Sequence, residues 1–413
     1  MLTLLLAATL PVSQAATAIL EVGPPVEVGV DGRHGRPFVG PDGRWHLGHG
    51  RSGHFHDVVL NADLSADLGS MRMLIDGAGR FVDHGLAQCP DGSLLHAASG
   101  NLAMPDDSAW VTAISADLVA GPTQLFLDQA PDVSTNDMAV LCADGFRAVA
   151  IAGYGDPELE QPQRNWLYRF DDDALAGATP PEVLPAHETP RVNGTSLVWI
   201  EEAQQAVFLA LSGGANLVAT YYDAQGAFAS RVTTQLTLDE GRQPYWSAGA
   251  LRLDAGYAIA HMGRSFDEGF AQDTGNVYLT LSDSELLVTE TIALTNLSAP
   301  DGAMRPGIAI RGDELLVAWD VDGRFYASVV RIDLDALAEL DADLPQDTGA
   351  PGRRPTGEDT GRDADTGAPR GPAGGGSTPP ASGCATAALA SPSGGLLLGL
   401  SVAWAALGRR RRP

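Results

Sequence analysis

The sequence predicts an all-β fold made of one structural unit that is repeated six times. An apolar strand, a tight turn and a second apolar strand recur along residues 19–338. A third strand that ends in an acidic turn follows each hairpin, and a fourth strand follows in five of the six units. The period is about 50 residues, which is typical of the blades of a β-propeller. We therefore expect a six-bladed β-propeller.

The hairpin turns carry the strongest local signal for this repeat. Asp42, Asp91 and Asp144 each precede a glycine between two apolar segments, at equivalent places in the first three units. Asp-Gly between alternating apolar residues is a strong hairpin motif, because glycine accepts the positive φ that such a turn needs. We expect a tight turn between the first two strands of these units.

The two ends of residues 19–338 complement one another. The sixth unit has no evident fourth strand, since "DALAEL" runs directly into a linker, and the N-terminal "AILEVGPPVEVG" has no hairpin of its own. We expect residues 19–30 to pair with the last unit as its missing strand, so that no blade edge is left unpaired. A pair of β-sandwich domains is the alternative, but one incomplete copy at each end favours a closed ring.

Both ends of the chain have the composition of export signals. Residues 1–18 combine an apolar stretch with small residues at a cleavage site, as in a secretory signal peptide. Residues 339–382 are dominated by Pro, Gly, Asp and Thr and predict a disordered linker, or stalk. Residues 385–408 carry no formal charge and are long enough for one C-terminal transmembrane helix, with arginines 409–412 on the cytoplasmic side.

The C-terminal segment 383–413 resembles the tripartite sorting tails of the myxosortase type, also called MYXO-CTERM. Those tails consist of a cysteine, a transmembrane segment and a basic cluster, and Cys384 matches the first of these parts. The resemblance implies a sorting protease of the myxosortase type as a partner and processing near Cys384. It also implies an exported protein of the cell envelope or cell surface with a single-pass membrane anchor.

Composition limits the remaining partners and the redox chemistry. The chain of 413 residues has a formal net charge of −26, which repels phosphate backbones, so we expect no nucleic acid. Cys89 and Cys142 occupy equivalent places in the second and third units. They could form an inter-blade disulfide in an exported protein. Because adjacent inner strands should fan apart, we favour two buried cysteines that are not bridged.

In a propeller, the first strand of every blade begins at the mouth of the central channel. The residues expected there are polar or aromatic, and they suit an extracellular glycan, peptide or protein ligand. They are Arg36, His84, Asp137, Arg191, Asn193, Tyr245 and Arg305. Arg36 and Arg305 come from the first and last blades, which the ring makes neighbours. We expect them to converge on one anionic group, either an external ligand or an internal carboxylate such as Asp83 or Asp137.

This arrangement resembles sialidase-like propellers, in which arginines from several blades clamp a carboxylate. The resemblance is architectural, since the Ser-x-Asp-x-Gly-x-Thr-Trp box of that family is absent from the sequence. It implies a glycoside hydrolase as the alternative function, with its carboxyl pair among Asp83, Asp137, Asp267 and Glu268. We favour ligand binding without catalysis, because a fold analogy does not supply a function.

A group of histidines in the first unit is the remaining candidate site. His54 and His56 lie two residues apart and would share one face of a strand, with His49 across the hairpin. These three are the candidates for a surface metal site, but no cysteine or further ligand at a suitable spacing supports one. We expect neither a metal nor another cofactor.

Overall fold

The computed structural model describes the propeller region of the chain. The described residues are 18–100, 107–130, 138–153, 164–177, 182–188, 192–212, 216–236, 238, 242–265, 275–286, 288–297 and 302–342. All of them belong to one compact unit, Met1–Thr356. Residues 1–17 of the predicted signal peptide 1–18, residues 343–382 of the predicted linker and the predicted sorting tail with Cys384 lie outside the described residues. Among those that are described, no helix is long and apolar enough to cross a bilayer.

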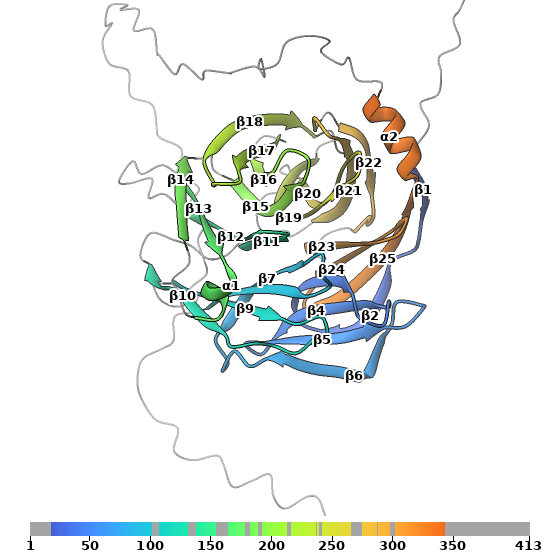
Figure 1. Cartoon of the computed structure of the whole chain (residues 1–413). Helices are drawn as coiled ribbons and strands as arrows, with labels where there is room; N and C mark the ends of the chain where they lie inside the picture. Colours follow the sequence, from blue (N-terminus) through green and yellow to red (C-terminus); the bar gives the residue numbers. More distant parts are fainter. Residues whose placement is uncertain are drawn as a thin grey trace, which may run out of the picture. The chain divides into compact units, whose positions relative to one another are not determined.

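Six antiparallel sheets form the blades of the predicted propeller (Figure 1). From the inner strand outwards, blade one contains β3 (Arg33–Val39), β4 (Trp45–Arg51), β5 (His54–Leu60) and β6 (Ala66–Ile75). Blade two contains β7 (Phe81–Gln88), β8 (Leu94–Gly100), β9 (Asp107–Ile114) and β10 (Gln124–Ala130). Blade three contains β11 (Met138–Ala143), β12 (Phe146–Gly153), β13 (Arg164–Phe170) and β14 (Glu182–Glu188).

The second half of the ring repeats this pattern. Blade four contains β15 (Val192–Ile200), β16 (Gln205–Ser212), β17 (Asn216–Asp223) and β18 (Phe228–Gln235). Blade five contains β19 (Arg242–Leu253), β20 (Gly256–Ser265), β21 (Asn276–Asp283) and β22 (Val288–Ala293). Blade six contains β23 (Ala303–Arg311), β24 (Glu314–Val321) and β25 (Arg324–Ile332), completed by β1 (Ile19–Val22) and β2 (Val26–Asp31). Two helices, α1 (Asp172–Leu175) and α2 (Leu334–Ala342), follow β13 and β25.

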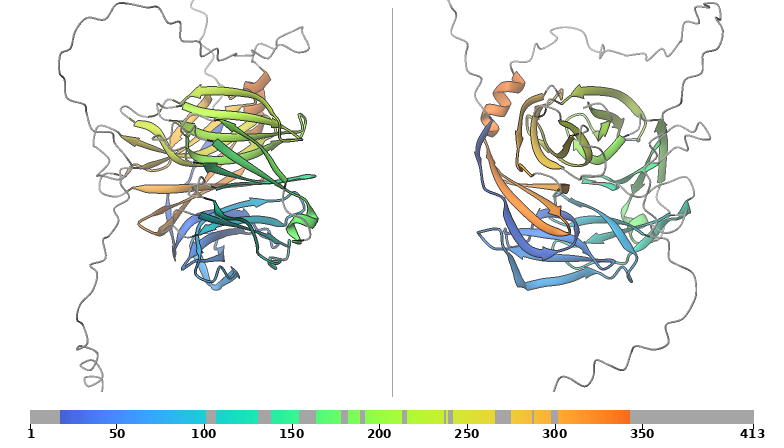
Figure 2. Two further views of the ribbon diagram at one scale, coloured as in Figure 1. Left: turned by 90° about the vertical axis from the view of Figure 1, so that its left-hand side faces the viewer. Right: turned by 180° about the vertical axis from the view of Figure 1, so that it is seen from behind.

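The N-terminal strands close the ring, as the sequence predicts. Both β1 and β2 pair antiparallel with β25, and their registers place Ile19 opposite Ile332 and Val26 opposite Ala327. Between them, the backbone N–H of Gly23 donates to the carbonyl of Val329 at 2.8 Å. Figures 1 and 2 show these blue strands beside the orange strands of the last blade. The outer edge of β25, near the C-terminal end of the propeller sequence, is therefore paired by strands from its N-terminal end.

The predicted Asp-Gly turns are also present. Gly43 and Gly92 adopt positive φ angles of 72° and 82°, which glycine reaches without steric cost. The Asp91 carboxylate accepts a hydrogen bond from the backbone N–H of Ser93 at 2.9 Å, and Asp42 does the same for Arg44 at 3.0 Å. The aspartate side chain thus satisfies a turn donor, while the glycine supplies the backbone geometry.

The acidic turn that the sequence predicts after the third strand contains a left-handed leucine that the sequence reasoning did not single out. Leu64, Leu118 and Leu286 occupy equivalent positions there with φ near 60–67°, and each side chain is buried. Glycine stands at the matching position of blade four, as Gly226. The left-handed backbone costs a non-glycine residue about 1 kcal/mol, whereas burying a leucine contributes about 2 kcal/mol. Leucine is therefore favoured at this strained position because its side chain fills the outer core.

The hydrophobic core lies between neighbouring blades. Trp319 and Leu279 pack with Leu337 of α2 in the cluster that joins blades five and six. Leu47 and Phe325 belong to the cluster that joins blades six and one. Helix α2 covers part of this core and continues past the expected propeller boundary at residue 338. Packing across every seam makes each blade depend on its two neighbours.

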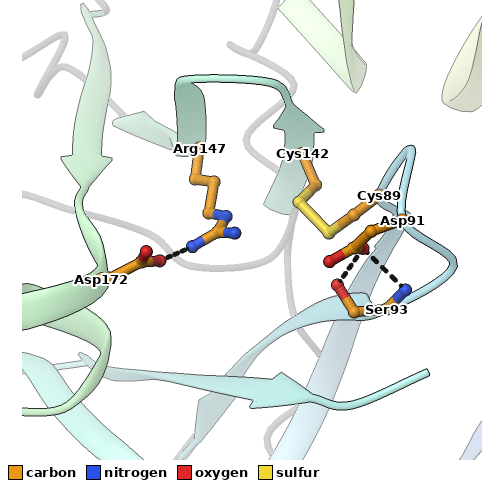
Figure 3. The surroundings of a disulfide bond; sticks show 6 residues. All are labelled: Cys89, Asp91, Ser93, Cys142, Arg147 and Asp172. Atoms are coloured by element: carbon orange, nitrogen blue, oxygen red, sulfur yellow. Dashed lines mark hydrogen bonds and ion pairs between the residues drawn. A yellow bond between two sulfur atoms is a disulfide. The ribbon is translucent and has the colours of Figure 1, made fainter. Parts of the chain in front are cut away.

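Cys89 and Cys142 form a disulfide between blades two and three, with their Cα atoms 4.8 Å apart (Figure 3). The expectation of two unbridged cysteines is wrong. Blades fan apart towards their outer strands, but Cys142 lies in the inner strand β11 and Cys89 directly follows the inner strand β7, where the two blades are close together. Hydrogen bonds of Asp91 with Ser93 and an ion pair of Arg147 with Asp172 lie next to the bridge.

Candidate functional site

The candidate site lies on the face of the ring where the inner strands begin, which we call the mouth face. Three of the predicted site residues, Arg36, His84 and Arg305, come together there. Asp137 and Arg191 lie outside the described residues, as do Asp267 and Glu268. Asn193 and Tyr245 are on the inner strands β15 and β19, but their side chains are not among those described.

Two buried pairs of a carboxyl group with a basic side chain form the centre of the site. His34 Nε2 lies 2.5 Å from Asp83 Oδ1, and both side chains are 10% exposed. Arg305 Nη1 lies 2.8 Å from Asp320 Oδ2, and the Asp320 side chain is 2% exposed. Together with Arg36, these four residues are called the channel-mouth cluster. Blades six, one and two all contribute to it.

Arg36 joins the three blades of the cluster. Its Nε donates to the carbonyl of His84 in blade two at 3.2 Å, and its Nη1 donates to the carbonyl of Pro306 in blade six at 3.3 Å. Arg36 and Arg305 therefore lie near one another, and both act on the pKa of Asp83. Arg305 nevertheless has an internal partner, Asp320, in place of the suggested Asp83 or Asp137.

The backbone places the cluster through bulges at the start of the inner strands. His34 and Arg305 have φ angles of 55° and 53°, and the strand register shifts beside each of them. A further register shift lies between Phe81 and Asp83 in β7. A bulge leaves one residue unpaired and re-aims its side chain. A left-handed non-glycine residue costs on the order of 1 kcal/mol, so this geometry persists only where the surroundings impose it.

Burial controls the protonation of the His34–Asp83 pair. Burial raises the pKa of Asp83 to about 7, although Arg305, Arg36 and Arg33 oppose the shift. Burial and the same arginines hold the pKa of His34 well below its usual value. At weakly acidic pH the pair is therefore a neutral carboxyl beside a neutral imidazole. Burial also raises the pKa of Asp320, against the opposing effect of Arg305.

Two of these residues were not singled out from the sequence, for different reasons. Asp320 is the penultimate residue of the apolar strand β24, and a carboxylate in such a strand is itself a signal of a buried polar group. His34 lies in a polar stretch, where only the bulge directs its side chain towards Asp83. Asp83 was expected at the mouth, and its location in the cluster agrees with that.

A pocket of about 580 Å³ adjoins the cluster on the mouth face and is called the arginine pocket. Residues 31–33, 50–53 and 322–324 line it, with Phe81, Val82 and His84. His84 is buried, and its Nδ1 lies 3.0 Å from Nε2 of His96. A side chain on Gly50 would collide with the His84 ring, which explains a glycine at that place. Burial, and then His96 and His34, hold the pKa of His84 well below its usual value.

The histidines proposed as metal candidates do not form a metal site in the described part of the chain. His49 stacks on His56 with ring centroids 5.7 Å apart, and His54 Nδ1 lies 2.9 Å from Asp76. Burial lowers the pKa of His49 to about 4. Among the described residues, no group of three or more His, Cys, Asp or Glu side chains is placed to hold an ion.

The fold and the site define a six-bladed β-propeller with a buried, charged channel mouth. No family model matches the chain, and no curated protein matches its sequence. Several solved propellers are similar in fold. A mutant of the NanB sialidase from Streptococcus pneumoniae is 8% identical with a TM-score of 0.50, and the match covers 79% of this chain and 72% of that one.

Two further solved structures have a lower TM-score. Trypanosoma rangeli sialidase is 9% identical with a TM-score of 0.45, and the match covers 76% of this chain but only 56% of the sialidase. Aleuria aurantia lectin in complex with Fucalpha1-6GlcNAc is 7% identical with a TM-score of 0.43, covering 75% and 91%. At such identities the likeness concerns the fold alone, and the function has to be argued from the site.

Proposed function

We propose that this protein is an exported, surface-anchored β-propeller that binds an acidic extracellular ligand at its channel mouth without catalysis. The observation that carries the proposal is the excess of positive charge at this mouth in a protein of net charge −26. Arg33, Arg36 and Arg305 surround Asp83 and Asp320, and Asp83 is protonated at weakly acidic pH. Positive charges held close together repel one another, and a ligand carboxylate bound among them would offset this repulsion.

The ligand class follows from the same groups. Guanidinium groups form strong, charge-assisted hydrogen bonds with carboxylates. A carboxylated sugar supplies that anion together with hydroxyl groups that match the polar surroundings. A peptide or protein would bind through an exposed carboxylate in the same way.

The test is the pH dependence of sugar binding by the full chain. Calorimetric titration with glucuronate should show binding at about pH 5.5 that becomes about tenfold weaker at about pH 8.5, because ionised Asp83 then removes one net positive charge. The Asp83→Asn variant should bind with little change over the same range. Glucose is the neutral control. Equal binding of glucose and glucuronate, or no binding of any carboxylated sugar and none of an acidic peptide, would refute the proposal.

The surface location is supported by the sequence signals and needs its own test. Cys384→Ala should prevent processing of the tail by the sorting protease while leaving export intact. Protease shaving of intact cells and the apparent mass of the released chain report both steps. Wild-type processing and display of the variant would remove the basis for the myxosortase-type sorting.

Glycoside hydrolysis is the second candidate, and one observation favours it. A carboxyl group whose pKa is about 7, as for Asp83, can act as a general acid at neutral pH. A panel of fluorogenic aryl glycosides should then be cleaved by the full chain, and Asp83→Asn should abolish the cleavage. Binding of an acidic sugar with no turnover of any of these glycosides would leave binding as the function.

A further inference from the structure

Three arginines in the arginine pocket differ from the arginines that form ion pairs in the described part of the chain. The chain has twice as many acidic residues as basic ones, and seven described arginines, Arg44 and Arg72 among them, pair with a carboxylate. Arg33, Arg51 and Arg324 are exposed, and among the described residues none of them forms an ion pair with a carboxylate. Arg51 makes one weak contact, 3.9 Å from the sulfur of Met71.

These arginines come from three segments that only the fold brings together. Arg33 begins β3, Arg51 ends β4, and Arg324 begins β25. All three line the same pocket of about 580 Å³, a size usual for small-molecule sites. Three guanidinium groups in one hollow repel one another, and in so acidic a protein unpaired arginines are not explained by a shortage of carboxylates.

The arginine pocket is continuous with the channel-mouth cluster. Arg33 lines the pocket and also acts on the pKa values of His34, Asp83 and Asp320. His84 lines the pocket too, and its carbonyl accepts the hydrogen bond from Arg36. One ligand can therefore contact both places with consecutive parts of its chain.

We propose that the arginine pocket is a second anionic subsite, and that the ligand is an acidic polysaccharide with anionic groups on successive sugars. This inference rests on the proposed function, because it extends the ligand bound at the channel mouth. Arginine forms bidentate hydrogen bonds with carboxylate and sulfate groups alike. Asp31 and Asp322 line the same pocket and can accept hydrogen bonds from sugar hydroxyls. A polyanion without hydroxyl groups cannot form these bonds, so the pocket favours an acidic sugar.

The net charge of the protein does not prevent such binding. Repulsion between the acidic surface and a polyanion is screened beyond about 8 Å at physiological salt. Direct contacts with arginines persist at that ionic strength, because they act at hydrogen-bond distance. The attraction between the arginines in the pocket and the anionic groups of the ligand would therefore outweigh the long-range repulsion from the negative net charge of the protein.

The experiment compares a monomer with a tetramer on the full-length chain. Galacturonate and tetragalacturonate are titrated by calorimetry in about 0.15 M salt, with a chondroitin sulfate tetrasaccharide as the sulfated probe. We expect the wild type to bind one of the tetramers at least about tenfold more tightly than the monomer, a gain of about 1.4 kcal/mol. Chondroitin sulfate carries carboxylates as well as sulfates. A gain for tetragalacturonate therefore shows that carboxylate is sufficient, and a gain for the chondroitin sulfate tetrasaccharide alone shows that sulfate is required.

Matched variants assign the gain to the pocket. Arg51→Gln with Arg324→Gln should remove the preference for the tetramer over the monomer. Arg44→Gln with Arg331→Gln removes two half-exposed arginines outside the pocket and should keep that preference. Maltotetraose is the neutral control, and poly-L-glutamate is the acidic control without hydroxyl groups. Both should bind at least about tenfold more weakly than the acidic tetramer.

The outcomes separate this inference from the proposed function. Binding of the monomer with no gain for either tetramer overturns the second subsite and leaves the channel-mouth site intact. Binding of a tetramer that depends on Arg51 and Arg324, without binding of any monomer, supports the subsite and contradicts the primary site. Equal losses in both double variants, or equally tight binding of poly-L-glutamate, overturn the assignment of a polysaccharide to this pocket.

Discussion

The protonation of Asp83 predicts how the stability of the propeller depends on pH. The unfolded carboxyl has the ordinary pKa of 3.8, whereas burial raises the folded pKa to about 7. As the pH rises from 3.8 to about 7, the unfolded state loses this proton and the folded state keeps it. The folded state therefore becomes less stable relative to the unfolded state over this interval, and the difference is constant above it.

The magnitude follows from the two pKa values. Each pH unit between them corresponds to about 1.4 kcal/mol, so Asp83 lowers the free energy of unfolding by about 4 kcal/mol at pH 8 relative to pH 4. Asp83→Asn cannot ionise and has no such loss. Any lost or gained hydrogen bond to His34 changes the stability of the variant by a constant amount. The free energy of unfolding of the variant, relative to that of the wild type, should therefore rise by about 4 kcal/mol from pH 4 to pH 8.

Denaturant unfolding of both proteins at about pH 4, 6 and 8 measures this difference directly. Asp254→Asn, which changes an exposed carboxylate in the turn between β19 and β20, is the control and should follow the wild type. A difference between Asp83→Asn and the wild type that stays flat with pH would show that Asp83 ionises normally in the folded protein. The argument for a net positive channel mouth would then fail with it.

Three further predictions concern the framework of the site. Arg305→Ala should lower the free energy of unfolding by about 3–5 kcal/mol, because Asp320 is left buried without its partner; a loss below about 1 kcal/mol in denaturant unfolding would contradict this. Deleting residues 19–30 should expose the edge of β25 and cause aggregation on size-exclusion chromatography, whereas a monodisperse product with unchanged melting would refute ring closure. The double variant Cys89→Ala, Cys142→Ala should have a free energy of unfolding about 2–4 kcal/mol lower than the wild type, because the disulfide is lost. Calorimetry should show the same loss for the wild type in reductant, and reductant should not change the stability of the variant.

The architecture of this protein could be predicted because its signals are local. Alternating apolar residues and Asp-Gly turns such as Asp91-Gly92 specify hairpins within a few residues, and their repetition specifies the blades. Ring closure followed from counting strands, since one end of the repeat lacked the strand that the other end had in excess. Composition and end signals led to the expectations of export and of an acidic surface without nucleic acid.

The site depended on contacts that sequence distance hides. Arg36 bonds to the carbonyl of a residue 270 positions away, and that contact exists only because the ring makes the first and last blades neighbours. The pairing of Arg305 with Asp320 and the direction of the His34 side chain depend on bulges whose register shifts have no sequence signature. Sequence reasoning identified residue types at the mouth, while the tertiary structure decided which charges are paired, which are buried and which remain available to a ligand, because burial and pairing are properties of neighbours in space.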